Sequence, residues 1–280
     1  LGGVGFPPGF FCPPPPTQRL RPRHESADGR QTVRCSSHCL VLGGSGYLGQ
    51  AVSSELANAG AKLAFTYHLN EDAARRLVAR LKSATAIRLD LGDPDAIGHG
   101  IAEAAAALDG LDALIDCAAV AAAMEPHGPG SRHAMQDVAV PDFDATYAVN
   151  VRAPFLACRQ AAPFLEHCGG GNIVLCSSLD AVKPLPSPVH FAATQGALGA
   201  MTRAMAKELG CKNIRVNLVA IGLLDGGLSR LVGAEARAEY VRHCSLRRVA
   251  KPEEIAAMVC WLALRNTYVT GQTIVLDGNL

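Results

Sequence analysis

Short apolar runs alternate with helix-forming stretches from residue 38 to the end of the chain. The predicted strands lie at 39–42, 63–67, 86–89, 111–115, 172–176, 214–219 and 273–276. The predicted helices lie at 46–59, 71–82, 94–108, 141–167, 189–209 and 252–264. Strands joined through helices in this way form parallel sheets covered by helices. The alternation predicts one α/β domain over 38–280, a doubly wound parallel sheet of about seven strands in three α/β/α layers.

Two segments fall outside this alternation. Residues 1–37 hold the run Pro13-Pro14-Pro15-Pro16, several glycines and five arginines, with no helical or strand periodicity. This composition predicts a disordered extension. The stretch 124–133 is rich in glycine and proline and is predicted to be a loop.

The composition excludes several functional classes. The chain has 280 residues with 49% hydrophobic and 18% charged residues, and its formal net charge is +1. This balance gives no indication of nucleic-acid binding. No apolar run reaches the roughly 18–20 residues of a membrane helix. The ten cysteines contain no Cys-x-x-Cys pair, and no residue pattern predicts a metal site. We therefore expect a cytoplasmic protein with reduced, mostly buried thiols.

A glycine-rich turn follows the first predicted strand and opens the first helix. It reads Gly43-Gly44-Ser45-Gly46-Tyr47-Leu48-Gly49. Gly43 permits a tight turn, Gly46 lets the backbone approach a pyrophosphate, and Gly49 allows close packing of the helix on the strand. The free N–H groups of the helix N-terminus attract anions. Strand, glycines and helix in this order predict a dinucleotide site.

Motifs in the second half of the chain are similar to those of the short-chain dehydrogenases/reductases. They include Tyr147-Ala148-Val149-Asn150-Val151, the strand end Cys176-Ser177-Ser178, and Val269-Thr270-Gly271-Gln272. The resemblance covers about 38–280 and is greatest to the β-ketoacyl-carrier-protein reductase branch. It implies a Rossmann-type fold, an NAD(P)-dependent oxidoreductase, and assembly into oligomers.

The resemblance also implies a catalytic quartet of Asn, Ser, Tyr and Lys, of which this chain keeps two. Asn150 and Ser178 stand at the first two positions, and Ser178 lies thirteen residues before Phe191. Phe191 replaces the Tyr and Gln195 replaces the Lys. Phenylalanine has no proton to donate, and glutamine has no charge with which to lower the pKa of a phenol. We therefore expect ketone reduction to be severely weakened.

The same resemblance indicates which positions line the cofactor. These are Gly43, Ser45, Gly46, Tyr47, Leu48, Gly49, His68, Asp90, Leu91, Ala118, Ala119, Gln195, Ile221 and Gly222. Gln195 is expected to reach the nicotinamide ribose. The second strand ends Thr66-Tyr67-His68 without the acidic residue that binds a ribose 2′-hydroxyl. NADP is therefore slightly favoured over NAD, with His68 or Lys62 near its 2′-phosphate.

Other titratable groups lie close to the altered positions. His190 precedes Phe191 but is expected to face elsewhere, since neighbouring helical residues point about 100° apart. Asp180 and Lys183 follow Ser178 and are candidates for a substitute acid or for an exposed loop. Cys176 is predicted to belong to the core.

Three functions stay open from the sequence. The first is a catalytically impaired homologue that binds a cofactor or acyl ligand and acts as a homo-oligomer or as the partner of an active paralogue. The second is an active NAD(P)H-dependent reductase of a small-molecule or carrier-bound acyl substrate, with Ser178 or a substitute acid. The third is an elimination or isomerisation without hydride transfer. The segment 223–247, with Arg247-Arg248, is predicted to form a substrate lid.

Overall fold

The computed structural model describes residues 37–81, 83–121, 135–183, 185 and 187–280. The predicted extension 1–37, apart from Ser37, and the predicted loop 124–133 lie outside these residues. Within the described part, no helix combines the length and the apolar character that a bilayer-spanning segment requires. The eight cysteines in this part are free thiols.

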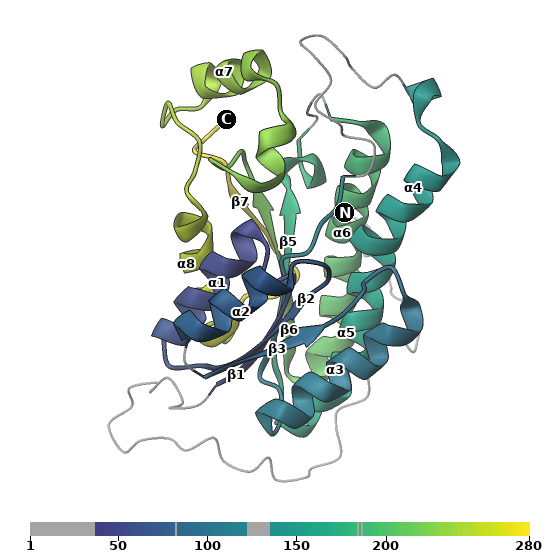
Figure 1. Ribbon diagram of the computed structural model, residues 1–280, viewed down its shortest axis with the longest axis vertical. Helices are drawn as coiled ribbons and strands as arrows, with labels where there is room; N and C mark the ends of the chain where they lie inside the picture. The colour runs from purple at the N-terminus through teal and green to yellow at the C-terminus, as the bar shows by residue number, and fades with distance from the viewer. Residues whose placement is uncertain (1–36, 82, 122–134, 184, 186) are drawn as a thin grey trace, which may run out of the picture.

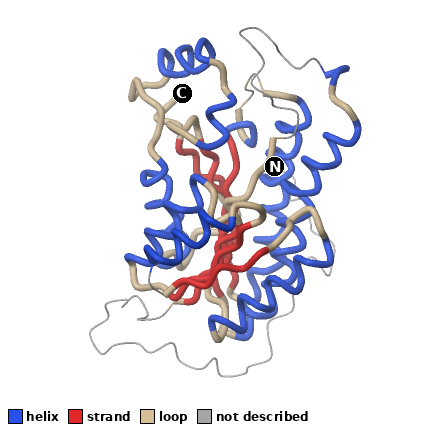
Figure 2. The backbone as a smooth tube through the Cα atoms, viewed as in Figure 1, coloured by secondary structure: helices blue, strands red, loops and turns tan. Residues whose placement is uncertain are grey.

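Seven parallel strands form one sheet, as the alternation predicts. In spatial order the sheet runs β3-β2-β1-β4-β5-β6-β7. Figure 2 shows these strands as a single twisted band between two layers of helices. The strands are β1 His38–Leu42, β2 Lys62–Tyr67, β3 Ala84–Arg88, β4 Ala113–Asp116, β5 Gly171–Ser178, β6 Ile214–Ile221 and β7 Thr273–Leu276. The fold is therefore the predicted Rossmann-type, doubly wound α/β sheet.

Helices cover both faces of the sheet, and each face has its own core. One layer consists of α1 (Tyr47–Asn58), α2 (Glu71–Leu81) and α8 (Pro252–Leu264), and the other includes α3 (Pro94–Leu108), α5 (Ala153–His167) and α6 (Val189–Leu209). Figure 1 shows the two groups on opposite sides of the strands. Their buried side chains form two large apolar clusters, one on each face. The central strands are apolar on both faces because both are covered.

The long helix predicted at 141–167 contains a wide turn. It divides into α4 (Val140–Tyr147), a π-helical segment at Ala148–Arg152, and α5. Pro154 lies at the start of α5 and has no N–H with which to bond the carbonyl four residues earlier, that of Asn150. Such π turns often mark functional sites. The segment places Asn150 where the helix is widened.

The lid segment, residues 223–247, holds a short helix that the sequence pattern did not predict. This helix, α7 (Ala234–His243), lies beyond one end of the sheet (Figure 1). Tyr240 anchors it, since its hydroxyl donates to the carbonyl oxygen of Asp277 at 2.9 Å and its ring packs with Leu179 and Cys244. A single buried residue on an otherwise polar helix gives little periodicity, which explains why the helix was missed.

Candidate functional site

The strand order reverses between β1 and β4, and this position defines the candidate site. From β1 the chain continues to β2 and β3 on one side, and from β4 to β5, β6 and β7 on the other. In such sheets the crevice beyond the carboxyl ends of the strands at this point binds ligands. Gly43 follows β1 at this edge, and Ala118 lies close to it beyond β4.

The glycine turn after β1 has the tight geometry that its sequence predicts. Gly43 has a φ of +66°, in the left-handed region, and its N–H donates to Thr66 Oγ1 at 2.9 Å. The N–H of Gly46 donates to the carbonyl oxygen of Gly43 at 2.9 Å and closes the turn. A Cβ atom at Gly49 would lie 2.2 Å from that same oxygen, so the helix packs too closely for a side chain.

The N-terminus of α1 fits an anionic group. Gly46 is the N-cap and supplies no side-chain hydrogen bond to the helix, and the first turn contains no acidic residue. The first N–H groups of a helix have no partner within the helix and carry partial positive charge. Ser45 and Leu48 flank Gly46 and Tyr47 in this turn. The turn therefore provides the kind of cradle that a pyrophosphate requires.

Tyr47 connects the glycine turn to the lid segment. Its hydroxyl donates to Asp225 Oδ1 at 2.5 Å, and this bond raises the pKa of the phenol, with burial adding to the effect. A Cβ atom at Gly226 would lie 2.5 Å from the Tyr47 ring, and one at Gly227 would lie 3.1 Å from Tyr47 Cβ. The two glycines thus give the ring its space. Sequence reasoning missed Asp225 because its partner is 178 residues away.

His68 and Asp90 approach each other beyond the ends of β2 and β3. His68 Nε2 lies 3.6 Å from Asp90 Oδ2, and both side chains are about half exposed. Asp90 Oδ1 also accepts the N–H of Gly92, and Leu91 lies between these two residues. Lys62, in contrast, is the first residue of β2 and lies at the amino end of that strand. The suggestion that Lys62 helps to hold a 2′-phosphate is therefore corrected.

Asp116 ends β4 beneath the site and carries a buried carboxyl group. Desolvation raises its pKa to about 7, although its Oδ1 accepts the N–H of Ala118 at 3.0 Å. Ala118 also packs on the glycine turn, because a Cβ atom at Gly43 would lie 2.9 Å from Ala118 Cα. Ala119 follows and is exposed. The end of β4 is thus in direct contact with the turn after β1.

Gln195 is turned towards β5. Its Oε1 accepts two hydrogen bonds of 2.9 Å, from Ser177 Oγ and from the N–H of Ser178. A backbone N–H can only donate, which identifies the amide oxygen as the atom that faces it. The side chain is 2% exposed, and Nε2 lies 3.3 Å from Thr194 Oγ1. The amide of Gln195 is therefore engaged by groups of the fold itself, and its bond to a ribose stays a prediction.

Ser178 is also bonded within the protein. Its hydroxyl donates to Asp180 Oδ2 at 2.6 Å and accepts the N–H of Asp180 at 3.1 Å. The expected bond from this hydroxyl to a substrate carbonyl would have to replace the bond to Asp180. The side chain of Asp180 lies close enough to compete with any carbonyl for the Ser178 proton.

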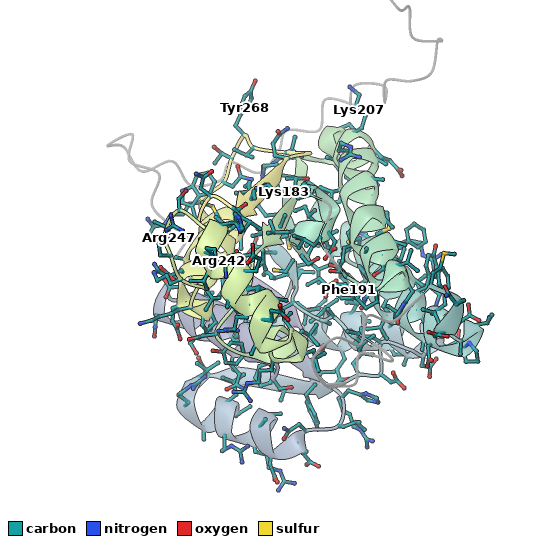
Figure 3. The ribbon with its side chains drawn as sticks, turned by 90° about the horizontal axis from the view of Figure 1, so that it is seen from above. Lys183, Phe191, Lys207, Arg242, Arg247 and Tyr268 are labelled. Carbon is teal, nitrogen blue, oxygen red and sulfur yellow. The ribbon has the colours of Figure 1, made fainter. Side chains whose placement is uncertain are left out.

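Phe191 is buried, whereas the nearby Lys183 is bonded to a carboxyl group. Phe191 is 9% exposed and lies towards the interior in Figure 3, which looks onto the molecule from above. Lys183 Nζ donates to Asp277 Oδ2 and to the carbonyl oxygen of Leu280, each at 2.6 Å. Burial favours the protonated form of Asp277, but the bond and charge of Lys183, together with the backbone N–H groups of Asn279 and Leu280, outweigh it and lower the carboxyl pKa. His190 is 1% exposed. Lys183 is thus committed to an ion pair.

Asn150 and the end of β6 complete the set of predicted positions. Asn150 is 1% exposed, its Oδ1 accepts the N–H of Val120 at 2.9 Å, and its Nδ2 donates to the Val120 carbonyl at 2.8 Å. Nδ2 also lies 3.3 Å from Thr194 Oγ1, so Asn150 links the chain after β4 to α6. Ile221 ends β6, and the N–H of Gly222 donates to the carbonyl of Leu276 at 2.9 Å.

Comparisons with known proteins place these features in a family. A family profile described as enoyl-(acyl carrier protein) reductase matches residues 45–279. Over 241 residues the chain is 31% identical to the cyclic-di-GMP-binding biofilm dispersal mediator protein of Escherichia coli (strain K12), which covers 85% of this chain and 94% of that protein. Over 246 residues it is 32% identical to dehydrogenase/reductase SDR family member 4 of Bos taurus, covering 85% of each chain.

The fold comparison adds a neighbour that holds a nucleotide. A short chain dehydrogenase from Burkholderia cenocepacia J2315, solved in complex with NADP, superposes with a TM-score of 0.78 at 30% sequence identity. The superposition covers 87% of this chain and 97% of that structure.

Proposed function

This chain belongs to the short-chain dehydrogenase/reductase family, and we propose that it binds NADP(H) but is impaired in proton transfer. The glycine turn, the N-terminus of α1 and Ala118 hold the nucleotide, and the end of β2, Thr66-Tyr67-His68, has no acidic residue for a ribose 2′-hydroxyl, which favours NADP over NAD. When bound, the nicotinamide supplies the hydride for reduction. The protein must supply the proton, and we propose that it donates this proton poorly.

The observation that carries the proposal is the closed hydrogen-bond set around Gln195. Its amide oxygen takes the donors of Ser177 and Ser178, and the Ser178 hydroxyl in turn donates to Asp180. Phe191, at the position where the family resemblance places the phenol, contributes no proton. These groups satisfy one another and leave no proton donor directed at a carbonyl. The loss of general-acid assistance reduces a rate by about 10²–10⁴-fold.

We propose further that the chain acts through assembly with other subunits. Large apolar side chains stay exposed along α4, α5 and the start of α6, with Phe143 41%, Tyr147 47%, Phe155 45% and Val189 48% exposed. The rings of Phe143 and Tyr147 stack at 6.5 Å. Exposed apolar patches of this kind mark interfaces. The partner is a second copy or an active paralogue. One relative, the mediator protein of Escherichia coli, is named for binding, not for a reaction.

An active reductase of a ketoacyl-type substrate is the second candidate function. The short bond of 2.6 Å between Ser178 and Asp180 supports it, because this pair combines a hydroxyl and a carboxyl at the carboxyl end of β5. In this alternative, Asp180 or a water molecule supplies the proton. Ser178→Ala would then abolish the oxidation of NADPH, whereas it would leave nucleotide binding by an impaired homologue unchanged.

The experiment that tests the proposal is calorimetric titration of the purified chain with NADPH and NADH, followed by turnover with β-ketoacyl thioesters. We expect NADPH to bind, NADH to bind more weakly, and turnover to be at background. Turnover at the rate of an ordinary family member would contradict the impairment. Absence of binding by either nucleotide would contradict the cofactor assignment, and product formed without any nucleotide would indicate a non-redox reaction.

A further inference from the structure

Two thiols face each other where β4 and β5 reach the candidate site. The last paired position of these strands is Asp116 opposite Leu175, and the next residues are Cys117 and Cys176. Their sulfur atoms lie 3.8 Å apart. Cys176 is 9% exposed, whereas Cys117 is more accessible. No role in the proposed function depends on either thiol.

We propose that Cys117 and Cys176 are a modification site, at which a low-molecular-weight disulfide converts the two thiols into a reversible disulfide between β4 and β5. Neighbouring strands lie about 4.7–4.9 Å apart, within the range of roughly 4.4–6.8 Å that Cα atoms of a disulfide span. The sulfur atoms can therefore come together by side-chain rotation, without moving the strands apart.

The proposed reaction consists of two thiol–disulfide exchanges. The Cys117 thiolate attacks one sulfur of the small disulfide RSSR, forms a mixed disulfide and releases one thiolate RS⁻. The Cys176 thiolate then attacks Cys117 Sγ, forms the protein disulfide and releases the second RS⁻. The two protons from the cysteines end on the two RSH products. Two protein thiols are oxidised and one small disulfide is reduced, through the mixed disulfide by which such exchanges proceed.

The order and speed of these steps follow from the surroundings. Cys117 reacts first because it is the more accessible thiol. Its hydrogen bond with Cys176, together with burial, raises its pKa, so only a small fraction is thiolate at neutral pH. Oxidation is therefore slow and needs sustained exposure. The close approach of the two strands places the bond near the short limit of disulfide geometry, and strained disulfides are readily reduced.

The position of Cys117 connects this bond to the nucleotide turn. The N–H of Cys117 donates to the carbonyl of Leu42 at the end of β1, and the next residue, Ala118, packs on Gly43. Because β4 lies between β1 and β5, drawing Cys117 towards Cys176 moves it away from β1 and loosens the contact of Ala118 with the turn. We therefore expect oxidation to weaken NADPH binding, a consequence that rests on the proposed function whereas the covalent bond does not.

The test is to incubate the full chain with oxidised glutathione and to map its disulfides by mass spectrometry. We expect a peptide pair linked through Cys117 and Cys176, lighter by two hydrogen atoms and restored by dithiothreitol. In Cys176→Ser we expect a lasting glutathione adduct on Cys117. Cys158→Ser, which removes a buried thiol of α5, is the matched control and should keep the linked pair. Wild-type chain that stays reduced at both positions, or that keeps the adduct without linking, would overturn the proposal.

Calorimetry on the same samples tests the coupling separately. We expect oxidation to weaken NADPH binding by at least about fivefold, the lower end of typical coupling between sites. A linked chain with unchanged affinity would contradict the coupling and leave the modification site standing. A reduced chain that does not bind NADPH would contradict the proposed function, while the mass measurement still decides the modification.

Discussion

The glycine turn after β1 and the region around Gln195 lie at the same edge of the sheet, yet they are built in different ways. Around Gly43, the left-handed φ, the close approach of Gly49 and the contact with Ala118 form a cradle without side chains. Around Gln195, polar side chains bond to one another and to β5. The first region is formed by the backbone of the turn. In the second region, the polar side chains already form hydrogen bonds with one another.

This difference teaches that binding and chemistry depend on separable parts of the fold. The cradle depends on backbone shape, which a few glycines maintain. In the proposed function, proton transfer depends on the side chains at the positions of Phe191 and Gln195, and both lie in the unbroken helix Val189–Leu209. A chain can therefore lose the second function without losing the first.

The largest expected effect comes from restoring the phenol and the cation together. We expect Phe191→Tyr with Gln195→Lys to raise NADPH-dependent reduction of β-ketoacyl thioesters by about 10²–10⁴-fold, since the lysine lowers the phenol pKa and the phenol donates the proton. Stopped-flow or steady-state loss of NADPH absorbance measures the gain.

The single variant Phe191→Tyr is the control for this gain. Without a neighbouring cation its phenol keeps a pKa near its usual value of about 10, so we expect little activity. The lysine also removes the acceptor for Ser177 Oγ and the Ser178 N–H, and we expect unfolding to become easier by about 1–3 kcal/mol. A double variant that folds, binds NADPH and still fails to reduce any of these substrates would show that the remaining site is damaged elsewhere.

A smaller effect should follow from adding one methyl group to the nucleotide turn. In Gly43→Ala the new Cβ would lie 2.9 Å from Ala118 Cα, and the residue would keep a left-handed φ. We expect the turn to distort in order to relieve this strain. A loss of about 1.4 kcal/mol of binding free energy lowers the affinity tenfold, so we expect NADPH affinity to fall by about tenfold or more. Calorimetric titration measures the loss.

Gly60 provides a matched control for that variant. It also has a positive φ, +85°, but a Cβ atom there would meet nothing within 4 Å. Gly60→Ala therefore introduces similar backbone strain without touching the turn. Equal loss of NADPH affinity in the two variants would assign the effect to general destabilisation and would weaken the comparison between the two regions.

A prediction about stability, and not about affinity or rate, concerns the buried carboxyl beside the turn. Burial raises the pKa of Asp116 to about 7, so the folded state holds a proton that the unfolded state has lost above about pH 4. The free energy of unfolding contributed by this group therefore falls as pH rises from about 4 to about 7, and then levels off. Asp116→Asn should remove that decline.

Denaturant unfolding across this pH range measures the difference between the two proteins. We expect Asp116→Asn to gain stability relative to wild type as pH increases, because ionisation of Asp116 favours the wild-type unfolded state while the buried carboxyl keeps its proton, and an amide does not ionise in either state. A constant difference between the two proteins at every pH would show that Asp116 does not titrate with a raised pKa.

The sequence was sufficient to predict the sheet and most of its helices. The alternation of apolar strands and amphipathic helices identified all seven strands, and the predicted bounds of 189–209, 252–264 and 273–276 agree with α6, α8 and β7. β5 runs to Ser178, as the strand end Cys176-Ser177-Ser178 indicates, two residues beyond the apolar run 172–176. α7 was missed, since it buries only Tyr240.

The site was predicted less completely, because its key contacts join residues far apart in sequence. The turn geometry at Gly43 could be anticipated, since strand, glycines and helix are local. The bond of Gln195 to β5 and the bond of Tyr47 to Asp225 could not, since side-chain partners depend on tertiary packing. Helix periodicity indicates that a residue faces inward, but not which polar atom it meets there.

If the chain binds a nucleotide as proposed, the contact of Tyr47 with Asp225, Gly226 and Gly227 would also govern the rate at which the nucleotide enters. While the ring rests on Gly226 and Gly227 and its hydroxyl holds Asp225, it fills the space beside the turn. A dinucleotide that needs this space binds only those protein molecules in which the Tyr47 ring has moved. The apparent dissociation constant then equals the intrinsic dissociation constant divided by the fraction of protein molecules in this open state. With about one molecule in ten open, the apparent affinity is about tenfold lower. The observed association rate would then reach a maximum as the nucleotide concentration rises. That maximum equals the rate at which the Tyr47 ring moves away from Gly226 and Gly227.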